Sequence, residues 1–215
     1  MAREVDLIVP LKQPSLGKSR LRGALDDIHD DDTHAELVLA LAADTLAAAT
    51  AANGVRRVLV VAADPLALTS LHRLGVEVVG DAGVRGLNTA LRRGEAILRG
   101  ADPGGVVAAL QADLPALRPD ELAMALGAAA DRRAFVADRQ GTGTTLLVAA
   151  PGEPLDPHFG TGSALAHTAS GAVPLDVAAP SLRSDVDTAA DLAHVRRLGL
   201  GWRTSTLLGE ACCLS

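Results

Sequence analysis

Short apolar runs rich in β-branched residues alternate with longer Ala- and Leu-rich segments along the first 130 residues of this chain. The short runs have the length of buried strands, and the longer segments have the spacing of helices. Uniformly apolar strands that alternate with helices predict a Rossmann-like α/β fold, a mainly parallel mixed sheet with helices on both faces. We expect strands at 5–10, 55–62, 76–79 and 106–110, and helices at 33–52, 65–74, 87–98 and 119–130.

The alternation loosens after residue 130, where two strand-like runs, 134–137 and 146–149, follow each other without a helix between them. Because the segment from Asp138 to Thr144 is rich in turn residues, we expect these two strands to pair antiparallel across a turn. Further on we expect a short helix at 163–170, a strand at 173–177 and a closing helix at 188–198. No linker or repeat divides the chain, so we assign residues 1–201 to a single domain and 202–215 to a flexible C-terminal tail.

The composition excludes several classes of partner. A formal net charge of −6 argues against a general nucleic-acid binder, which usually carries a basic face. With no Tyr, two Phe and one Trp, the chain has no aromatic platform for stacking bases. The longest apolar runs are interrupted before the roughly 18 residues that a membrane helix needs, and the N-terminal residues lack a secretory-signal pattern. We therefore expect a cytoplasmic protein with neither nucleic-acid nor membrane partners, and the pattern indicates no oligomeric state.

The cysteines and histidines suggest no chemistry of their own. Cys212 and Cys213 are adjacent near the C-terminus, which excludes a long-loop disulfide framework and a zinc site. The last four residues match a prenylation pattern, but no polybasic stretch adjoins them, and a tail is the simpler interpretation. The six histidines show no metal-ligand spacing, and no catalytic triad can be inferred from residue order. We expect no covalent catalysis.

A basic loop follows the first expected strand. It carries Lys12, Lys18 and Arg20, with a glycine at position 17. Ligands of open α/β sheets bind beyond the carboxyl ends of the strands, and cations with backbone amides there can hold a triphosphate. The loop does not match the Walker pattern. We interpret the three cations as phosphate ligands, and an exposed basic loop is the alternative.

Two acidic segments are candidates for a metal site. Asp113 directly follows the expected strand at 106–110, and Asp185 precedes the last expected helix. Carboxylates suit Mg²⁺, which takes one or two of them together with phosphate oxygens. A turn or capping role is the alternative for Asp113. We assign Asp185 to the metal, and leave Asp187 divided between support of the metal site and capping, because either Asp187 or Thr188 could cap the following helix.

Two loops rich in glycine and hydroxyl residues, 141–144 and 159–163, could form an anion site for a second acidic substrate. Such strings are more often plain turns. Asn88 opens the expected helix at 87–98 and is a candidate nucleotide contact, although a residue that only starts the helix would look the same.

These segments, in this order, resemble the guanylyltransferase family of coenzyme F-420 biosynthesis, which includes enzymes acting on 2-phospho-L-lactate and on phosphoenolpyruvate. The resemblance extends from Val5 to about Gly201 and rests on the motifs LKQPSLGKSRL, GLNTAL, LQADLPAL, FVADRQGTGTTLL, HFGTGSALAH and LRSDVDTAADL. FVADRQGTGT is most similar to the phosphoenolpyruvate-using branch. The resemblance implies a nucleotidyltransferase fold, Mg²⁺ on Asp113 and Asp185, and the acidic substrate on Thr144, Gly160 and Ser163.

The implied reaction joins phosphoenolpyruvate to GTP, giving enolpyruvoyl-2-diphospho-5'-guanosine and pyrophosphate. Lys12, Lys18 and Arg20 are then expected to hold the leaving pyrophosphate, with catalysis by positioning and charge neutralisation. Rival interpretations are a same-fold enzyme acting on phospholactate, a glycosyltransferase using Asp185-Val186-Asp187 as its Asp-x-Asp motif, and a non-catalytic nucleotide-binding regulator. An Asp-x-Asp motif is expected after a strand in mid-domain, whereas this one lies about thirty residues from the end of the chain.

Overall fold

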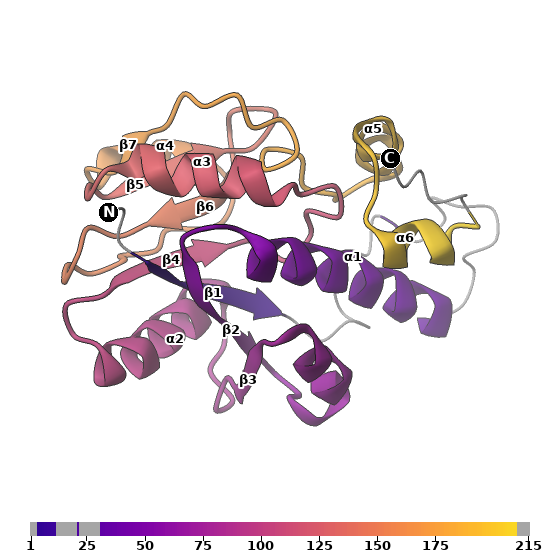
Figure 1. The fold of residues 1–215 in the computed structure, drawn as a ribbon, viewed down its shortest axis with the longest axis horizontal. Helices are drawn as coiled ribbons and strands as arrows, with labels where there is room; N and C mark the ends of the chain where they lie inside the picture. The colour runs from indigo at the N-terminus through magenta and orange to yellow at the C-terminus, as the bar shows by residue number, and fades with distance from the viewer. Residues whose placement is uncertain (1–3, 12–20, 22–30, 210–215) are drawn as a thin grey trace.

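The computed structural model describes residues 4–11, 21 and 31–209, which build a seven-stranded sheet in the order β3-β2-β1-β4-β6-β5-β7 (Figure 1). The neighbours β1, β2, β3 and β4 pair in parallel, whereas β6 runs antiparallel to β4 and β5. This mixed sheet confirms the predicted fold class and the predicted antiparallel pair, which is β5 and β6. The strands are β1 (Val5–Leu11), β2 (Val55–Ala62), β3 (Glu77–Gly80), β4 (Val106–Leu110), β5 (Ala134–Ala137), β6 (Thr144–Val148) and β7 (Val173–Pro174).

The order of the strands creates a switch point between β1 and β4. From β1 the chain runs outward through β2 to β3, and then returns to the other side of β1 to form β4. Ligands of open sheets bind in the crevice outside the carboxyl ends at such a point. Because β6 is antiparallel to β4, its first residue, Thr144, lies at the same edge of the sheet as the end of β4.

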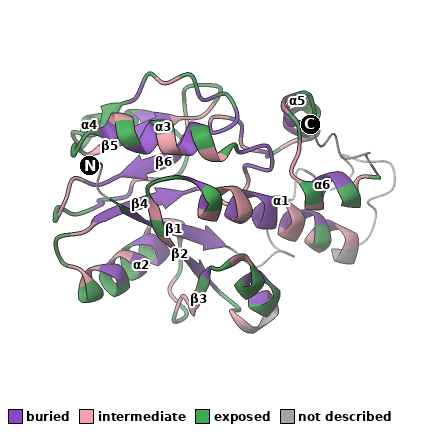
Figure 2. Cartoon of the chain, in the orientation of Figure 1, coloured by how far each residue is buried: buried purple, intermediate pink, exposed green. Residues whose placement is uncertain are grey.

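Helices cover both faces of the sheet (Figures 1 and 2). On one face, α1 (Asp31–Ala51), the 3-10 helix η3 (Leu66–Leu74) and α3 (Pro119–Ala129) pack against alternate strand residues such as Leu7 and Val9. On the other face, α2 (Leu87–Ala101) and α4 (Ser163–Ala169) pack against Ile8 and its neighbours. Both faces of the strands are thus buried, as their continuous apolar runs predicted.

A third apolar cluster forms at one end of the molecule, where α5 (Ala189–Leu198) and α6 (Trp202–Leu207) meet the first half of α1. The flexible tail predicted from residue 202 was therefore wrong as far as Leu207, because α6 is helical and packs beside α1 (Figure 1). The buried Asp44 carboxylate of α1 accepts the backbone N–H groups of Arg203 at 3.0 Å and Thr204 at 2.8 Å. Cys212 and Cys213 lie outside the described residues.

Two further elements differ from their predicted form. The strand expected at 173–177 pairs with β5 only over Val173–Pro174. The N–H groups of Val173 and Leu175 donate to the carbonyls of Arg133 and Phe135, and Pro174 between them has no N–H to offer on the outer edge of the sheet. The helix expected at 65–74 is a 3-10 helix that ends at Gly75, whose φ is 75°.

One window of α1, Thr33–Ala51, is long and apolar enough to cross a membrane, but 61% of it is buried inside the protein. Its leucines, among them Leu37, Leu41 and Leu46, belong to the apolar clusters described above. This helix therefore serves as a core element of the fold.

Candidate active site

Asp113 lies on the turn that follows β4, and one side chain of α1 holds that turn on both sides of it. The hydroxyl oxygen of Thr45, which is fully buried, accepts the backbone N–H of Leu114 at 2.9 Å. The same oxygen lies 2.8 Å from the carbonyl of Leu41 and 3.2 Å from that of Ala112, so the hydroxyl proton is donated to one of these. Thr45 thereby fixes the backbone immediately after Asp113, and its hydroxyl lies within hydrogen-bond distance of the carbonyl immediately before it.

The segment that carries Asp185 is brought against this turn. The backbone N–H of Val186 donates to the carbonyl of Asp113 at 3.1 Å, and the Val186 side chain is fully buried. Two residues later, Thr188 caps α5 and forms a capping box with Asp191, which settles the choice of cap that the sequence left open. Asp187 is exposed, and its backbone N–H donates to the Asp191 carboxylate of this capping box at 3.3 Å.

Helix α3 anchors the approach to Asp185. The buried carboxylate of Glu121 accepts the backbone N–H and the hydroxyl of Ser181 at 2.8 and 2.7 Å. Two residues on, the Arg183 guanidinium donates to the carbonyls of Ala137 and Leu175 at 3.1 and 2.9 Å. The loop that presents Asp185 is therefore fastened to α3 and to the end of β5.

The donor set at this edge fits magnesium. Asp113 and Asp185 are both half-buried, and carboxylate oxygens on adjoining turns leave the remaining positions of a cation to phosphate oxygens and water. Within the described parts of the chain, no three His, Cys, Asp or Glu side chains are grouped as metal ligands. Among the described residues, Asp113 and Asp185 therefore do not belong to a closed cage of the kind that holds a structural zinc.

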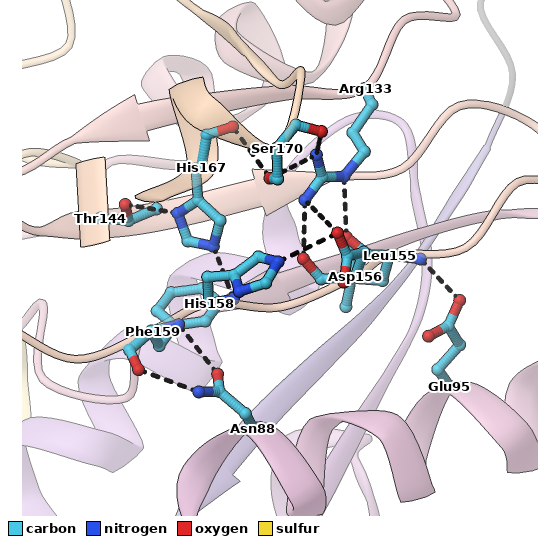
Figure 3. Close-up of polar contacts among 10 residues, drawn as sticks. All are labelled: Asn88, Glu95, Arg133, Thr144, Leu155, Asp156, His158, Phe159, His167 and Ser170. Atoms are coloured by element: carbon cyan, nitrogen blue, oxygen red, sulfur yellow. Dashed lines mark hydrogen bonds and ion pairs between the residues drawn. The ribbon is translucent and has the colours of Figure 1, made fainter. Parts of the chain in front are cut away.

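A buried cluster of two hydroxyl groups and one imidazole lies at the start of β6, and Figure 3 shows two of its members, Thr144 and His167. The Thr144 hydroxyl oxygen is 3.2 Å from the Ser163 hydroxyl and 2.9 Å from Nδ1 of His167. The other ring nitrogen of His167, Nε2, accepts the backbone N–H of His158 at 3.0 Å. Two of the three residues expected to bind the acidic substrate, Thr144 and Ser163, are thus in direct contact. The third, Gly160, accepts the backbone N–H of Ser163 through its carbonyl at 3.1 Å.

These contacts assign the charge and tautomer of His167. Since Nε2 accepts a hydrogen bond from a backbone N–H, the ring is neutral and carries its proton on Nδ1, which donates to Thr144. Burial, assisted by the nearby charges of Arg133 and His158, lowers the pKa of His167 to about 4. His167 therefore works as a neutral connector between β6 and the loop before α4.

The loop from Leu155 to Phe159 is fixed by three further side chains (Figure 3). Glu95 of α2 accepts the N–H of Leu155 at 2.8 Å, and Arg133 donates to the Leu155 carbonyl at 2.9 Å. Asn88 makes a two-way contact with Phe159, accepting its N–H at 2.8 Å and donating to its carbonyl at 3.0 Å. The amide of Asn88, predicted to contact nucleotide, is thus engaged with this loop.

The turn between β5 and β6 is held by one carboxylate. Asp138 accepts the backbone N–H groups of Thr142 and Gly143, each at 2.8 Å. A Cβ at Gly143 would collide with this carboxylate, which is why a glycine is required there. The carbonyl of Thr142 in turn accepts the N–H of Ala164 at 3.1 Å, so this turn and the start of α4 form one surface beside Thr144.

Lys12, Lys18 and Arg20 lie outside the described residues, and their predicted contacts with phosphate stay a prediction. Two positioning residues were missed by sequence reasoning. His167 follows Ser163 by four residues and so shares its helix face, a signal that could have linked the two. Thr45 gave no signal, because its partners are backbone groups about seventy residues away in the sequence.

Comparisons with known proteins agree in pointing to one family. Residues 5–208 match the sequence profile described as "Guanylyl transferase CofC like". A phosphoenolpyruvate guanylyltransferase from Salinispora arenicola is 52% identical over 208 residues, covering 95% of this chain and 94% of the relative. A protein of the same name from Streptomyces scabiei is 52% identical over 205 residues, covering 93% of each chain.

Solved structures with low sequence identity share the fold. A structure described as a nucleotide-diphospho-sugar transferase from Desulfovibrio desulfuricans G20 has a TM-score of 0.66 at 17% identity, covering 96% of this chain and 94% of its own. A 4-diphosphocytidyl-2C-methyl-D-erythritol synthase has a TM-score of 0.61 at 14% identity, covering 91% and 99%. The sheet described above is therefore the fold of these nucleotidyltransferase-type proteins.

Proposed function

Because this chain belongs to the family of CofC-like guanylyl transferases, we propose that it transfers the guanylyl group of GTP to phosphoenolpyruvate, a step in coenzyme F-420 biosynthesis. The observation that carries this proposal is that the turns bearing Asp113 and Asp185 and the hydroxyl group of Thr144 lie at the same edge of the sheet. The backbone N–H of Val186, the residue after Asp185, donates to the carbonyl of Asp113. Thr144 begins β6, the strand next to β4, and its hydroxyl contacts that of Ser163 at the start of α4.

The chemistry asks the protein mainly to position its substrates. A phosphate oxygen of phosphoenolpyruvate attacks the α-phosphorus of GTP, the bond to the β-phosphate breaks, and pyrophosphate leaves with the electron pair. A phosphate is already ionised near neutral pH, so no strong general base is required. Thr144, Ser163 and the Gly160 loop hold the acceptor, and Lys12, Lys18 and Arg20 hold the departing phosphates.

Asp113 and Asp185 are the residues that would hold Mg²⁺. When bound there, the ion neutralises the charge of the phosphates and orients them. Thr45, Glu121 and the Val186 N–H keep the two carboxylate-bearing turns in place before substrate arrives, so that little reorganisation is needed.

Mass spectrometry of the products from GTP, Mg²⁺ and phosphoenolpyruvate tests this function directly. We expect enolpyruvoyl-2-diphospho-5'-guanosine together with pyrophosphate. Turnover with 2-phospho-L-lactate but none with phosphoenolpyruvate would reject the proposed acceptor while retaining guanylyl transfer.

Asp113→Asn and Asp185→Asn test the site. Each is expected to lower kcat/KM by about 100-fold or more, since a charged ligand for the phosphate-bound ion is lost. Asp120→Asn, on the exposed start of α3, is the matched control and is expected to keep wild-type activity. Full activity with unchanged Mg²⁺ dependence in both site variants would show that the metal assignment is wrong.

A further inference from the structure

A cavity of about 270 Å³ opens at the carboxyl ends of β1 and β2, beside the start of α2. Leu11, Val61 and Ala90 give it largely apolar walls. Drug-sized ligands occupy pockets of roughly 300–1,000 Å³, so this volume suits one planar base better than a whole nucleotide. Leu11 directly precedes Lys12, the first of the cations assigned to the triphosphate. The cavity is thus next in sequence to the predicted phosphate loop.

Within the described part of the chain, the lining of this cavity carries one carboxylate, Asp81, and one guanidinium, Arg85. Asp81 follows β3 and its N–H donates to the carbonyl of Ala62 at 2.8 Å, which fixes it to the end of β2. Arg93 of α2 donates to the carbonyl of Gly80 at 2.8 Å and fixes the preceding residue. The carboxylate is therefore carried by backbone that is anchored from two sides.

The turn after Asp81 uses one of its two carboxylate oxygens. Oδ1 accepts the N–H of Gly83 at 2.8 Å. Ala82 and Gly83 both have positive φ, 57° and 72°, a conformation that alanine rarely adopts. Backbone held in a disfavoured conformation beside a cavity is common at ligand sites.

We propose that this cavity receives the base of the nucleotide and that Asp81 selects guanine, an inference that rests on the guanylyl transfer proposed above. Guanine presents two neighbouring donors, N1–H and the 2-amino group, and a carboxylate accepts both. Adenine presents an acceptor at N1, which a carboxylate repels. A half-buried acceptor that is left without its donors discriminates against the wrong base, and the planar Arg85 guanidinium can stack on the ring.

Asp81→Asn is the decisive variant because it changes the base-reading group while keeping the turn. The amide oxygen can still accept the Gly83 N–H, and the amide nitrogen places a donor where the second carboxylate oxygen stood. Xanthosine triphosphate, which has a carbonyl in place of the 2-amino group, matches that donor. We expect kcat/KM for GTP to fall at least about tenfold, that for xanthosine triphosphate to rise, and KM for phosphoenolpyruvate to stay unchanged.

Two controls keep the outcome interpretable. Glu77→Gln removes an exposed carboxylate of β3 outside the cavity and should leave the preference for GTP unchanged. Calorimetric titration of GTP and xanthosine triphosphate without an acceptor measures base selection even if phosphoenolpyruvate is not the acceptor. An Asp81→Asn protein that folds and still prefers GTP by the wild-type ratio in this titration would overturn the inference. Absence of turnover in the wild type would count against the proposed function alone.

Discussion

A buried histidine connects β6 to the loop before α4, and its protonation state matters for the stability of this part of the protein. His167 is fully buried, donates to Thr144 and accepts from the His158 N–H, so both ring nitrogens are used by the neutral form. A protonated ring would place an N–H against the N–H of His158. The two hydrogen bonds of the His167 ring in Figure 3 can therefore both form only while His167 is uncharged.

We predict a pH dependence of stability that follows from this residue. The pKa of His167 lies at about 4 in the folded protein and near 6.5 in the unfolded chain, so between these values only the unfolded chain binds the proton. The stabilisation that neutral His167 gives the folded protein is complete above pH 6.5. As the pH falls toward 4, up to roughly 3 kcal/mol of the free energy of unfolding is lost. Urea denaturation at a series of pH values measures this loss.

His167→Asn is expected to be less stable at pH 7 and to flatten the slope between pH 6.5 and 4. His72→Asn, on the exposed face of η3, is the control and should keep the wild-type slope. A His167→Asn protein whose stability changes with pH as steeply as that of the wild type would contradict the neutral-connector role.

At the level of single residues, the sequence predicted types of chemistry better than partners. Asp113 could be placed at the end of a strand because a buried apolar run ends just before it. Asn88 was assigned to nucleotide from its place at the start of a helix, whereas its amide binds the backbone of Phe159, 71 residues away. Which group a side chain meets at such a distance depends on tertiary packing, and periodicity carries no information about it.

Among the elements, α1 does more than fill the core. Thr45 and Asp44 are neighbours on this helix, yet Thr45 binds the Asp113 turn and Asp44 binds the start of α6. An apolar run long enough to resemble a membrane span therefore includes the two polar residues that join the Asp113 turn to the C-terminal helix.

We predict that Thr45→Val damages the metal site while leaving the fold intact. Valine has a similar shape but cannot accept the buried Leu114 N–H, a loss that costs roughly 1–3 kcal/mol of stability. Small displacements of a catalytic group can lower the rate by up to about 100-fold. We expect kcat to fall and the half-saturating Mg²⁺ concentration to rise, both measured in the pyrophosphate-release assay.

Thr45→Ser keeps the hydroxyl and is expected to restore the wild-type Mg²⁺ requirement. If Thr45→Val titrates with Mg²⁺ like the wild type, the clamp on Asp113 has no role in metal binding.

Elements with strong local patterns were predicted well, and those decided by packing were not. The run at 106–110 and the run at 134–137 are strands over the residues expected. Helix α6 was missed because its six residues have no long periodic pattern, and its N-terminal N–H groups are satisfied by Asp44, a residue far away in the sequence. Gly201 before α6 is needed because a Cβ there would collide with the same carboxylate.

At the scale of the whole molecule, the C-terminal helix belongs to the folded unit that carries the site. The Gly201 N–H donates to the carbonyl of Pro115, two residues after Asp113, and Leu208 packs with the third apolar cluster. The Asp113 turn, α1 and α6 thus contact one another, so a change in α6 should alter the position of the Asp113 turn.

We predict that a chain ending at Gly201 is less stable than one ending at Gly209. Without α6, the Asp44 carboxylate loses the N–H groups of Arg203 and Thr204, and hydrogen bonds to charged groups are worth about 1.5–3 kcal/mol each. Water can replace part of these hydrogen bonds to Asp44, so we expect the free energy of unfolding, measured by urea denaturation, to fall by roughly 2–5 kcal/mol. The chain ending at Gly209 keeps every contact named here and serves as the control. Because Asp44 and Thr45 are adjacent, the shorter chain should also require more Mg²⁺ for half-maximal activity; equal stability and equal Mg²⁺ requirement of the two chains would mean that α6 is dispensable for both fold and site.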